Sequence, residues 1–177
     1  MNAAGIPYSQ IRNAVAWALA KPDEEVGGFF FRCPELGVMF MNAPGQVDTA
    51  EHISGVAPIA EVGPVGKRVF SSTFTIEPSW MAYQILHNNR EPLACFHSHP
   101  SGIAEPSVTD VRQFPVHYAR VGFIYAVGHV ARAGMSALGL ERWMARTAFQ
   151  ITSYNEMGKL GVIQVSPLES GEMSLNG

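Results

Sequence analysis

Two histidines and an aspartate within residues 97–110 have the types and spacing of a metal site. His97 and His99 follow an apolar run at residues 93–96 that is typical of a buried strand. Because residues two apart on a strand point to the same face, both imidazoles are expected side by side. Two imidazole nitrogens and the carboxylate of Asp110 leave a fourth position for water, which is the pattern of a catalytic zinc rather than a structural one.

The residues between the histidines and the aspartate predict a loop followed by a helix. Pro100 and Gly102 end the strand and open the loop. Ser107 has the position of an N-cap, with Asp110 one turn later. Taken separately, a histidine pair is usually chance and Ser-x-x-Asp is usually only a cap. Together, and in this order, they favour a metal site.

The same segment resembles the signature of the JAMM metalloproteases, also called JAB or MPN+ domains. His-Ser-His-Pro at residues 97–100, then Ser-x-x-Asp after Pro106, carry the resemblance, which extends from about Ile11 to at least Val127. It implies a curved mixed β-sheet flanked by helices, the cytidine-deaminase-like fold of that family. It also implies one Zn²⁺ per chain, held by His97, His99 and Asp110.

The family carries a catalytic glutamate upstream, in a Glu-x-(Cys/Gly)-Gly context on the first strand. Residues 25–28, Glu-Val-Gly-Gly, fit that context, so the resemblance implies Glu25 as general base. The neighbouring Glu24 leaves the register open by one residue. Without the metal motif, both glutamates would be interpreted as part of a solvated turn.

These residue types support metal-assisted hydrolysis of an amide. A zinc ion held by two histidines and one aspartate lowers the pKa of a bound water toward ~7. Glu25 can take the proton of that water and deliver it to the leaving amine. The hydroxyl of Ser107 can donate to the developing oxyanion, which is worth ~3 kcal/mol for comparable donors. No covalent acyl-enzyme is expected.

Hydrophobic periodicity predicts alternating helices and strands, hence an α/β or α+β domain. One helix is expected over residues 9–20 with Ser9 as its N-cap, and another over residues 77–89 with Met81 and Leu86 among the residues facing the sheet. Strands are expected at residues 26–32, 38–42, 53–57, 69–76, 92–96, 121–127 and 158–165. The region between the last two is ambiguous: residues 138–143 and 147–151 are strand-like, but a helix is possible at residues 142–149.

Composition favours one ordinary folded domain. The chain has 177 residues, 47% hydrophobic and 15% charged, and a net charge of −3. We expect a single domain at residues 1–165 and a flexible tail at residues 166–177. Cys33 and Cys95 are too few for a disulfide framework. Neither nucleic-acid binding nor a membrane segment is expected. Because both cysteines are expected to be free, an intracellular, reducing location is the simplest expectation: cytoplasmic, or virion-associated if the protein is phage-encoded.

The substrate and context leave alternatives open. The resemblance implies a protein or peptide substrate, with the bond at the C-terminus of a ubiquitin-like protein as the leading case. A second context is phage tail assembly, in which the domain processes a protein or serves as a structural component. A third is the RadC-like group, but the short segment before Glu25 has no room for its N-terminal helical region. The oligomeric state is left open.

Overall fold

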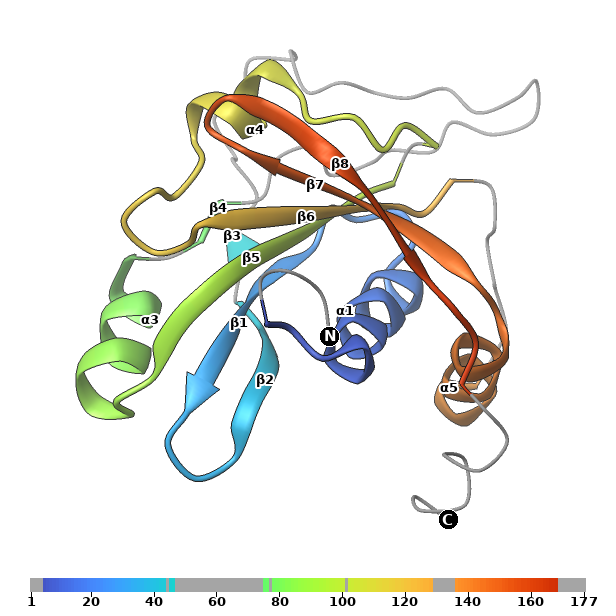
Figure 1. Cartoon of the computed structure of the whole chain (residues 1–177), viewed down its shortest axis with the longest axis horizontal. Helices are drawn as coiled ribbons and strands as arrows, with labels where there is room; N and C mark the ends of the chain where they lie inside the picture. Colours follow the sequence, from blue (N-terminus) through green and yellow to red (C-terminus); the bar gives the residue numbers. More distant parts are fainter. Residues whose placement is uncertain are drawn as a thin grey trace.

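The computed structural model describes residues 5–43, 45–46, 75–76, 78–100, 102–128 and 136–168. Within them, a six-stranded sheet has the order β2-β1-β5-β6-β7-β8 (Figure 1). The strands are β1 (Gly27–Cys33), β2 (Gly37–Asn42), β5 (Glu91–His99), β6 (Val121–Ala126), β7 (Phe149–Asn155) and β8 (Gly158–Val165). The sheet is mixed, because β5 and β6 run parallel while the other neighbours are antiparallel. The expected mixed α/β class is confirmed.

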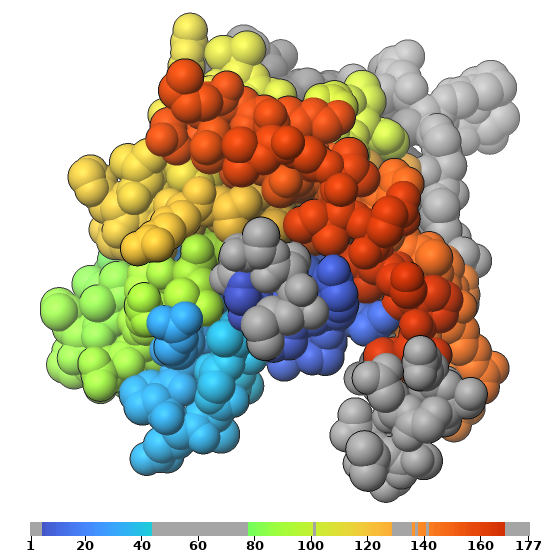
Figure 2. All heavy atoms as spheres, in the orientation of Figure 1, coloured from blue at the N-terminus to red at the C-terminus, as the bar shows by residue number. Residues whose placement is uncertain are grey.

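Helices flank this sheet, and a small second sheet pairs β3 (Gly45–Gln46) with β4 (Thr75–Ile76). The helical segments are α1 (Tyr8–Ala20), α3 (Pro78–Ala82) with the π-helical turn η1 (Tyr83–His87), α4 (Val108–Arg112) and α5 (Ala137–Arg146). In the space-filling view, the β7–β8 hairpin (orange to red) lies across the upper part of the visible face of the molecule, and β1 and β2 (blue) lie in the lower part of that face (Figure 2). None of the described helices is long and apolar enough to cross a membrane.

Alternation along the central strands divides the core between the two faces of the sheet. Phe30 and Phe96 are buried on the face covered by α1 and α5. Phe29 and Cys95 belong to a second buried cluster, together with Met81 of α3. Both faces are covered, which explains the continuous apolar runs in β1 and β5. Because His97 lies two residues after Cys95, its side chain is directed to the second cluster's face.

Three local expectations are wrong for identifiable reasons. The cap position of α1 is Pro7, which makes no side-chain cap, so Ser9 already lies inside the helix. Residues 138–143 belong to α5 rather than to a strand, since Ser136 accepts a hydrogen bond from the backbone N–H of Gly139 at 3.1 Å and caps the helix. Leu86 is 78% exposed.

The exposure of Leu86 follows from the π-helical turn. Hydrogen bonding over five residues rather than four changes which residues face the sheet after Ala82. Gln84 is buried in this turn, and its side-chain oxygen accepts hydrogen bonds from Asn88 and Arg90. The expected inward position of Met81 is confirmed.

Other expectations fall partly or wholly outside the described residues. The strand at residues 53–57 lies outside them, and only residues 75–76 of the strand at 69–76 are described. The strand at residues 158–165 is confirmed as β8. Of the predicted tail, residues 166–168 are described, and the N–H of Leu168 donates to the carbonyl of Ala145 at 2.7 Å. The domain limits stay predictions.

Candidate metal centre

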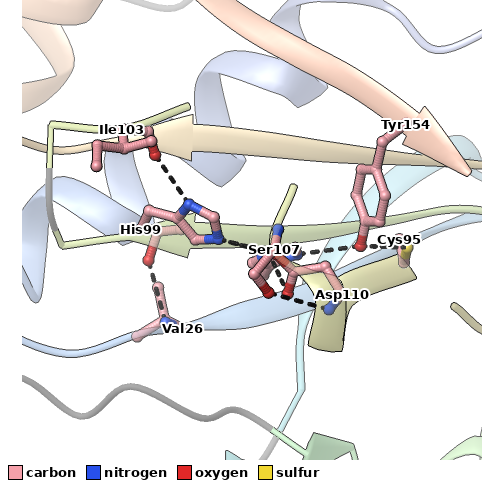
Figure 3. Close-up of polar contacts among 9 residues, drawn as sticks. Val26, Cys95, His99, Ile103, Ser107, Asp110 and Tyr154 are labelled. Atoms are coloured by element: carbon pink, nitrogen blue, oxygen red, sulfur yellow. Dashed lines mark hydrogen bonds and ion pairs between the residues drawn. The ribbon is translucent and has the colours of Figure 1, made fainter. Parts of the chain in front are cut away.

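The structure brings His97 and His99, at the end of β5, together with Asp110 of α4. Figure 3 shows His99 beside Asp110. The Nε2 atom of His97 lies 3.2 Å from Asp110 Oδ1, and that of His99 lies 3.3 Å from Asp110 Oδ2. The two Nε2 atoms are 3.1 Å apart. Ligands of a tetrahedral ion at 2.0–2.1 Å are separated by about 3.3 Å, so the two imidazole nitrogens and the carboxylate lie close enough together to hold one metal ion.

Hydrogen bonding fixes which nitrogen of His99 is available. Its Nδ1 lies 2.9 Å from the carbonyl oxygen of Ile103 (Figure 3). Because a carbonyl only accepts, Nδ1 carries the proton, and in the neutral ring the lone pair is on Nε2, which faces Asp110. Burial opposes charging of this ring, but the hydrogen bonds that the protonated ring donates to Asp110 and Ile103 raise the pKa of His99. A cation at this position would satisfy both the lone pair and the carboxylate.

Asp110 is oriented by a capping box at the start of α4. Its backbone N–H donates to Ser107 Oγ at 3.1 Å, and its Oδ2 accepts from the N–H of Ser107 at 2.7 Å (Figure 3). The local Ser-x-x-Asp sequence therefore holds the carboxylate before any metal binds. The hydroxyl of Ser107 accepts one bond in the cap and keeps its own proton for another acceptor.

The two adjacent glutamates have different surroundings. Glu25 lines the same cavity as His97 and Asp110. The side chain of Glu24 is 60% exposed, and its carboxylate lies 3.8 Å from Lys21 Nζ. Of the two carboxylates, Glu25 is therefore the one that shares a cavity with the candidate ligands His97 and Asp110.

The backbone after Glu25 is tied directly to the histidine strand. The N–H of Val26 donates to Ser98 Oγ at 3.1 Å, and the N–H of Ser98 donates to the carbonyl of Val26 at 2.8 Å. In the antiparallel pairing of β1 with β5, Gly27 lies opposite His97. Glu25, two residues before Gly27, is thus directed to the face on which His97 lies.

Burial and charge separate the ionisation of the two carboxyl groups. Burial, followed by the nearby charge of Asp110, raises the pKa of Glu25 to about 9. Burial also disfavours the charged form of Asp110, but hydrogen bonds from His97 and His99 hold its pKa well below the usual range. Two carboxyl groups of opposite preference in one site are typical of acid–base chemistry.

A cavity of about 320 Å³ adjoins the metal centre. Its polar wall includes Glu25, His97 and Asp110. Much of the remaining wall is apolar or aromatic, and is formed by Phe29, Pro78, Met81, Pro115 and Tyr118. Since a water molecule takes about 30 Å³, the cavity has room for more than a metal ion and its water.

Sequence reasoning missed Tyr154, whose hydroxyl lies 3.2 Å from Nδ1 of His97. This residue is in β7, after the segment that was expected to form a strand at residues 147–151. A single tyrosine far from the motif carries no local signal of a role at the site. It is found only through the pairing of β7 with β6.

A family model and a solved structure are similar to this chain. The family model Prok-JAB, described as prokaryotic homologs of the JAB domain, matches residues 7–145. The crystal structure of a JAB1/MPN domain protein from Archaeoglobus fulgidus is 13% identical, with a TM-score of 0.40, over 92% of this chain and 96% of that chain. No curated protein matches this chain.

Proposed function

Since this chain belongs to the family of prokaryotic homologs of the JAB domain, we propose that it is a zinc-dependent hydrolase of an amide bond in a protein or peptide. The observation that carries this proposal is the meeting of His97, His99 and Asp110 at ligand spacing, with Glu25 in the same cavity. The JAB family includes the JAMM metalloproteases, and this donor set is suited to their metal.

The residues present fit a zinc ion. It would be held by three protein ligands: the Nε2 atoms of His97 and His99 and the carboxylate of Asp110. Nitrogen and oxygen ligands suit zinc, and three of them leave the fourth coordination position open, as in catalytic zinc sites. When bound, zinc supplies Lewis acidity that activates water and polarises a carbonyl.

Glu25 is the residue proposed to move protons. A nearby cation favours its ionised form, which lowers its pKa from the value of about 9 in the metal-free protein. Its carboxylate then accepts a proton from the attacking water and delivers it to the leaving amine nitrogen. The hydroxyl of Ser107 is proposed to donate to the carbonyl oxygen as that atom becomes negative.

The substrate is proposed from two observations of different kind. The family resemblance favours a bond at the C-terminus of a ubiquitin-like protein. The cavity adds a preference, because Phe29, Met81 and Tyr118 give it an apolar wall beside the metal centre. A substrate with an apolar side chain next to the scissile amide would bury this apolar wall, and its own apolar surface, away from water. We therefore expect substrates with such side chains to be preferred over substrates with glycine at that position.

A paired-variant experiment tests this function. The full chain is purified, its zinc content is measured, and it is incubated with a proteome-derived peptide library whose new N-termini are identified by mass spectrometry. We expect about one zinc per chain and new N-termini that disappear with a chelator or in Glu25→Gln. The matched control is Glu24→Gln, since Glu24 is exposed and pairs with Lys21.

The outcomes separate the competing functions. Cleavage by Glu24→Gln but not by Glu25→Gln, with zinc retained in both, supports the hydrolase. Equal cleavage by Glu25→Gln would refute its role as general base. Zinc binding without any cleavage would favour a structural role, such as that of a tail-assembly component.

A further inference from the structure

We propose that Tyr154 is a positioning residue that holds His97 for metal binding, and that Gly122 provides the space through which its ring reaches that histidine. The proposal rests on the metal site described above. It concerns a residue two strands away from β5, outside the sequence motif.

The contact between Tyr154 and His97 is specific and buried. The Tyr154 hydroxyl lies 3.2 Å from His97 Nδ1, and the rings meet edge to face, with centroids 5.6 Å apart and planes at 88°. Tyr154 is 3% exposed. Water therefore does not compete easily for this bond, and the hydroxyl fixes the orientation of the imidazole.

A hydroxyl suits both states of the metal site, because it donates and accepts. When Nε2 of His97 offers its lone pair to a cation, Nδ1 carries the proton and donates to the Tyr154 oxygen. The Tyr154 proton then has Cys95 Sγ as its acceptor, 3.9 Å away (Figure 3). Without a cation, Nε2–H can donate to Asp110 at 3.2 Å, and the tyrosine donates to Nδ1.

Gly122 of β6 lacks a side chain, which allows the Tyr154 ring to lie over β6 and reach His97 on β5. It lies opposite Tyr154 of β7 on one side and opposite Cys95 of β5 on the other. A Cβ atom at Gly122 would lie 2.3 Å from Cε1 and 2.6 Å from Cζ of Tyr154, and 3.0 Å from Cys95 Sγ. Any side chain at this position would displace the ring from His97.

The same ring also contacts the segment that follows α4. Phe114 packs against Tyr154 edge to face, with centroids 5.5 Å apart and planes at 77°. Tyr154 therefore contacts a ligand of β5 and the chain just after the helix that carries Asp110. Partners that orient a metal-bound histidine typically contribute 10–100-fold to metal affinity.

The test uses Tyr154→Phe, which removes one oxygen, and Tyr125→Phe as its matched control. Tyr125 is buried on the opposite face of the sheet, among the residues that pack with α1 and α5. Zinc affinity is measured by competition with a chelator. We expect a loss of about tenfold or more for Tyr154→Phe, in line with such histidine partners, and no loss for Tyr125→Phe.

A second measurement reports on the hydrogen bond itself. In the zinc-loaded protein, the Nδ1 proton of His97 should give a slowly exchanging NMR signal that is lost in Tyr154→Phe and kept in Tyr125→Phe. Gly122→Ala should lose at least as much affinity as Tyr154→Phe. If Gly122→Ala does not fold, Tyr154→Phe alone decides the question.

The outcomes distinguish this proposal from the function on which it rests. Tight zinc binding by the wild-type protein with unchanged affinity in Tyr154→Phe would overturn the positioning role and leave the metal site standing. An equal loss in Tyr125→Phe would also overturn it. No zinc binding by the wild-type protein would overturn the metal site itself, and this proposal with it.

Discussion

Glu25 and Asp110 line one cavity, but their pKa values shift in opposite directions. Burial and the charge of Asp110 raise the pKa of Glu25 to about 9. Hydrogen bonds from the two histidines outweigh burial at Asp110 and lower its pKa. The metal-free site thus holds one neutral and one charged carboxyl group at neutral pH.

The first prediction concerns the stability of the metal-free protein. The pKa of Glu25 in the folded protein is about 9, well above its reference value of 4.5, which applies to the unfolded chain. Between pH 4.5 and 9 the carboxyl group is therefore ionised in the unfolded chain but protonated in the folded one, and this increasingly disfavours folding as the pH rises. Glu25→Gln should therefore raise the free energy of unfolding at pH 8, by ~1 kcal/mol or more, since each pKa unit is worth ~1.4 kcal/mol. At pH 4 the difference should vanish.

Urea denaturation in the presence of a chelator measures this effect at both pH values. Glu24→Gln is the control and should change the unfolding free energy little, because exposed ion pairs contribute ~1 kcal/mol or less. A Glu25→Gln protein less stable than wild type at pH 8 would contradict the raised pKa.

The second prediction compares the cap at the candidate site with a cap elsewhere, because Ser107 both orients Asp110 and is proposed to donate to the oxyanion. Ser107→Ala removes an N-cap and should lower the free energy of unfolding by ~1 kcal/mol. The matched variant Ser136→Ala removes the equivalent cap of α5, where Ser136 accepts from Gly139. Both should lose similar stability, but only Ser107→Ala should lose turnover, by ~100-fold or more. Equal turnover in the two variants would remove Ser107 from the reaction.

The third prediction links zinc to folding. A ligand that binds only the folded chain stabilises it by ~2.7 kcal/mol at 100 times its Kd. Zinc should therefore raise the melting temperature of the wild-type protein, and a chelator should reverse the rise. Asp110→Asn removes one ligand and should abolish both effects. A zinc-dependent rise that persists in this variant would place the ion elsewhere.

The fourth prediction addresses the cavity wall. Tyr118 lines the cavity and is 39% exposed. Tyr118→Ala should lower kcat/KM for a peptide with a large apolar residue beside the scissile bond by about tenfold, and leave the glycine analogue unchanged. Tyr83→Ala is the control, because Tyr83 is exposed on η1 and stacks on His87. Equal effects on both peptides would argue against a side-chain pocket.

Local rules were sufficient for part of this protein. The side-by-side placement of His97 and His99 follows from strand alternation, and the Ser107–Asp110 capping box follows from the residue types at a helix start. The helix at residues 137–146 was expected only from residue 142, because Leu138 and Leu140 alternate as in a strand; in the helix Leu138 is 55% exposed, whereas Leu140 and Met144, four residues apart, are buried. Leu86 was misplaced because a π-helical turn has no sequence signature here.

The sequence by itself determined the candidate ligand types, their order and the helix start that orients Asp110, because these depend on backbone periodicity and capping within a few residues. Only the tertiary structure decided that Glu25 rather than Glu24 faces the ligands, and that Tyr154 reaches His97 across Gly122. Both depend on the register between strands that are distant in sequence. Register is set by the packing of both faces of the sheet, which no local pattern encodes.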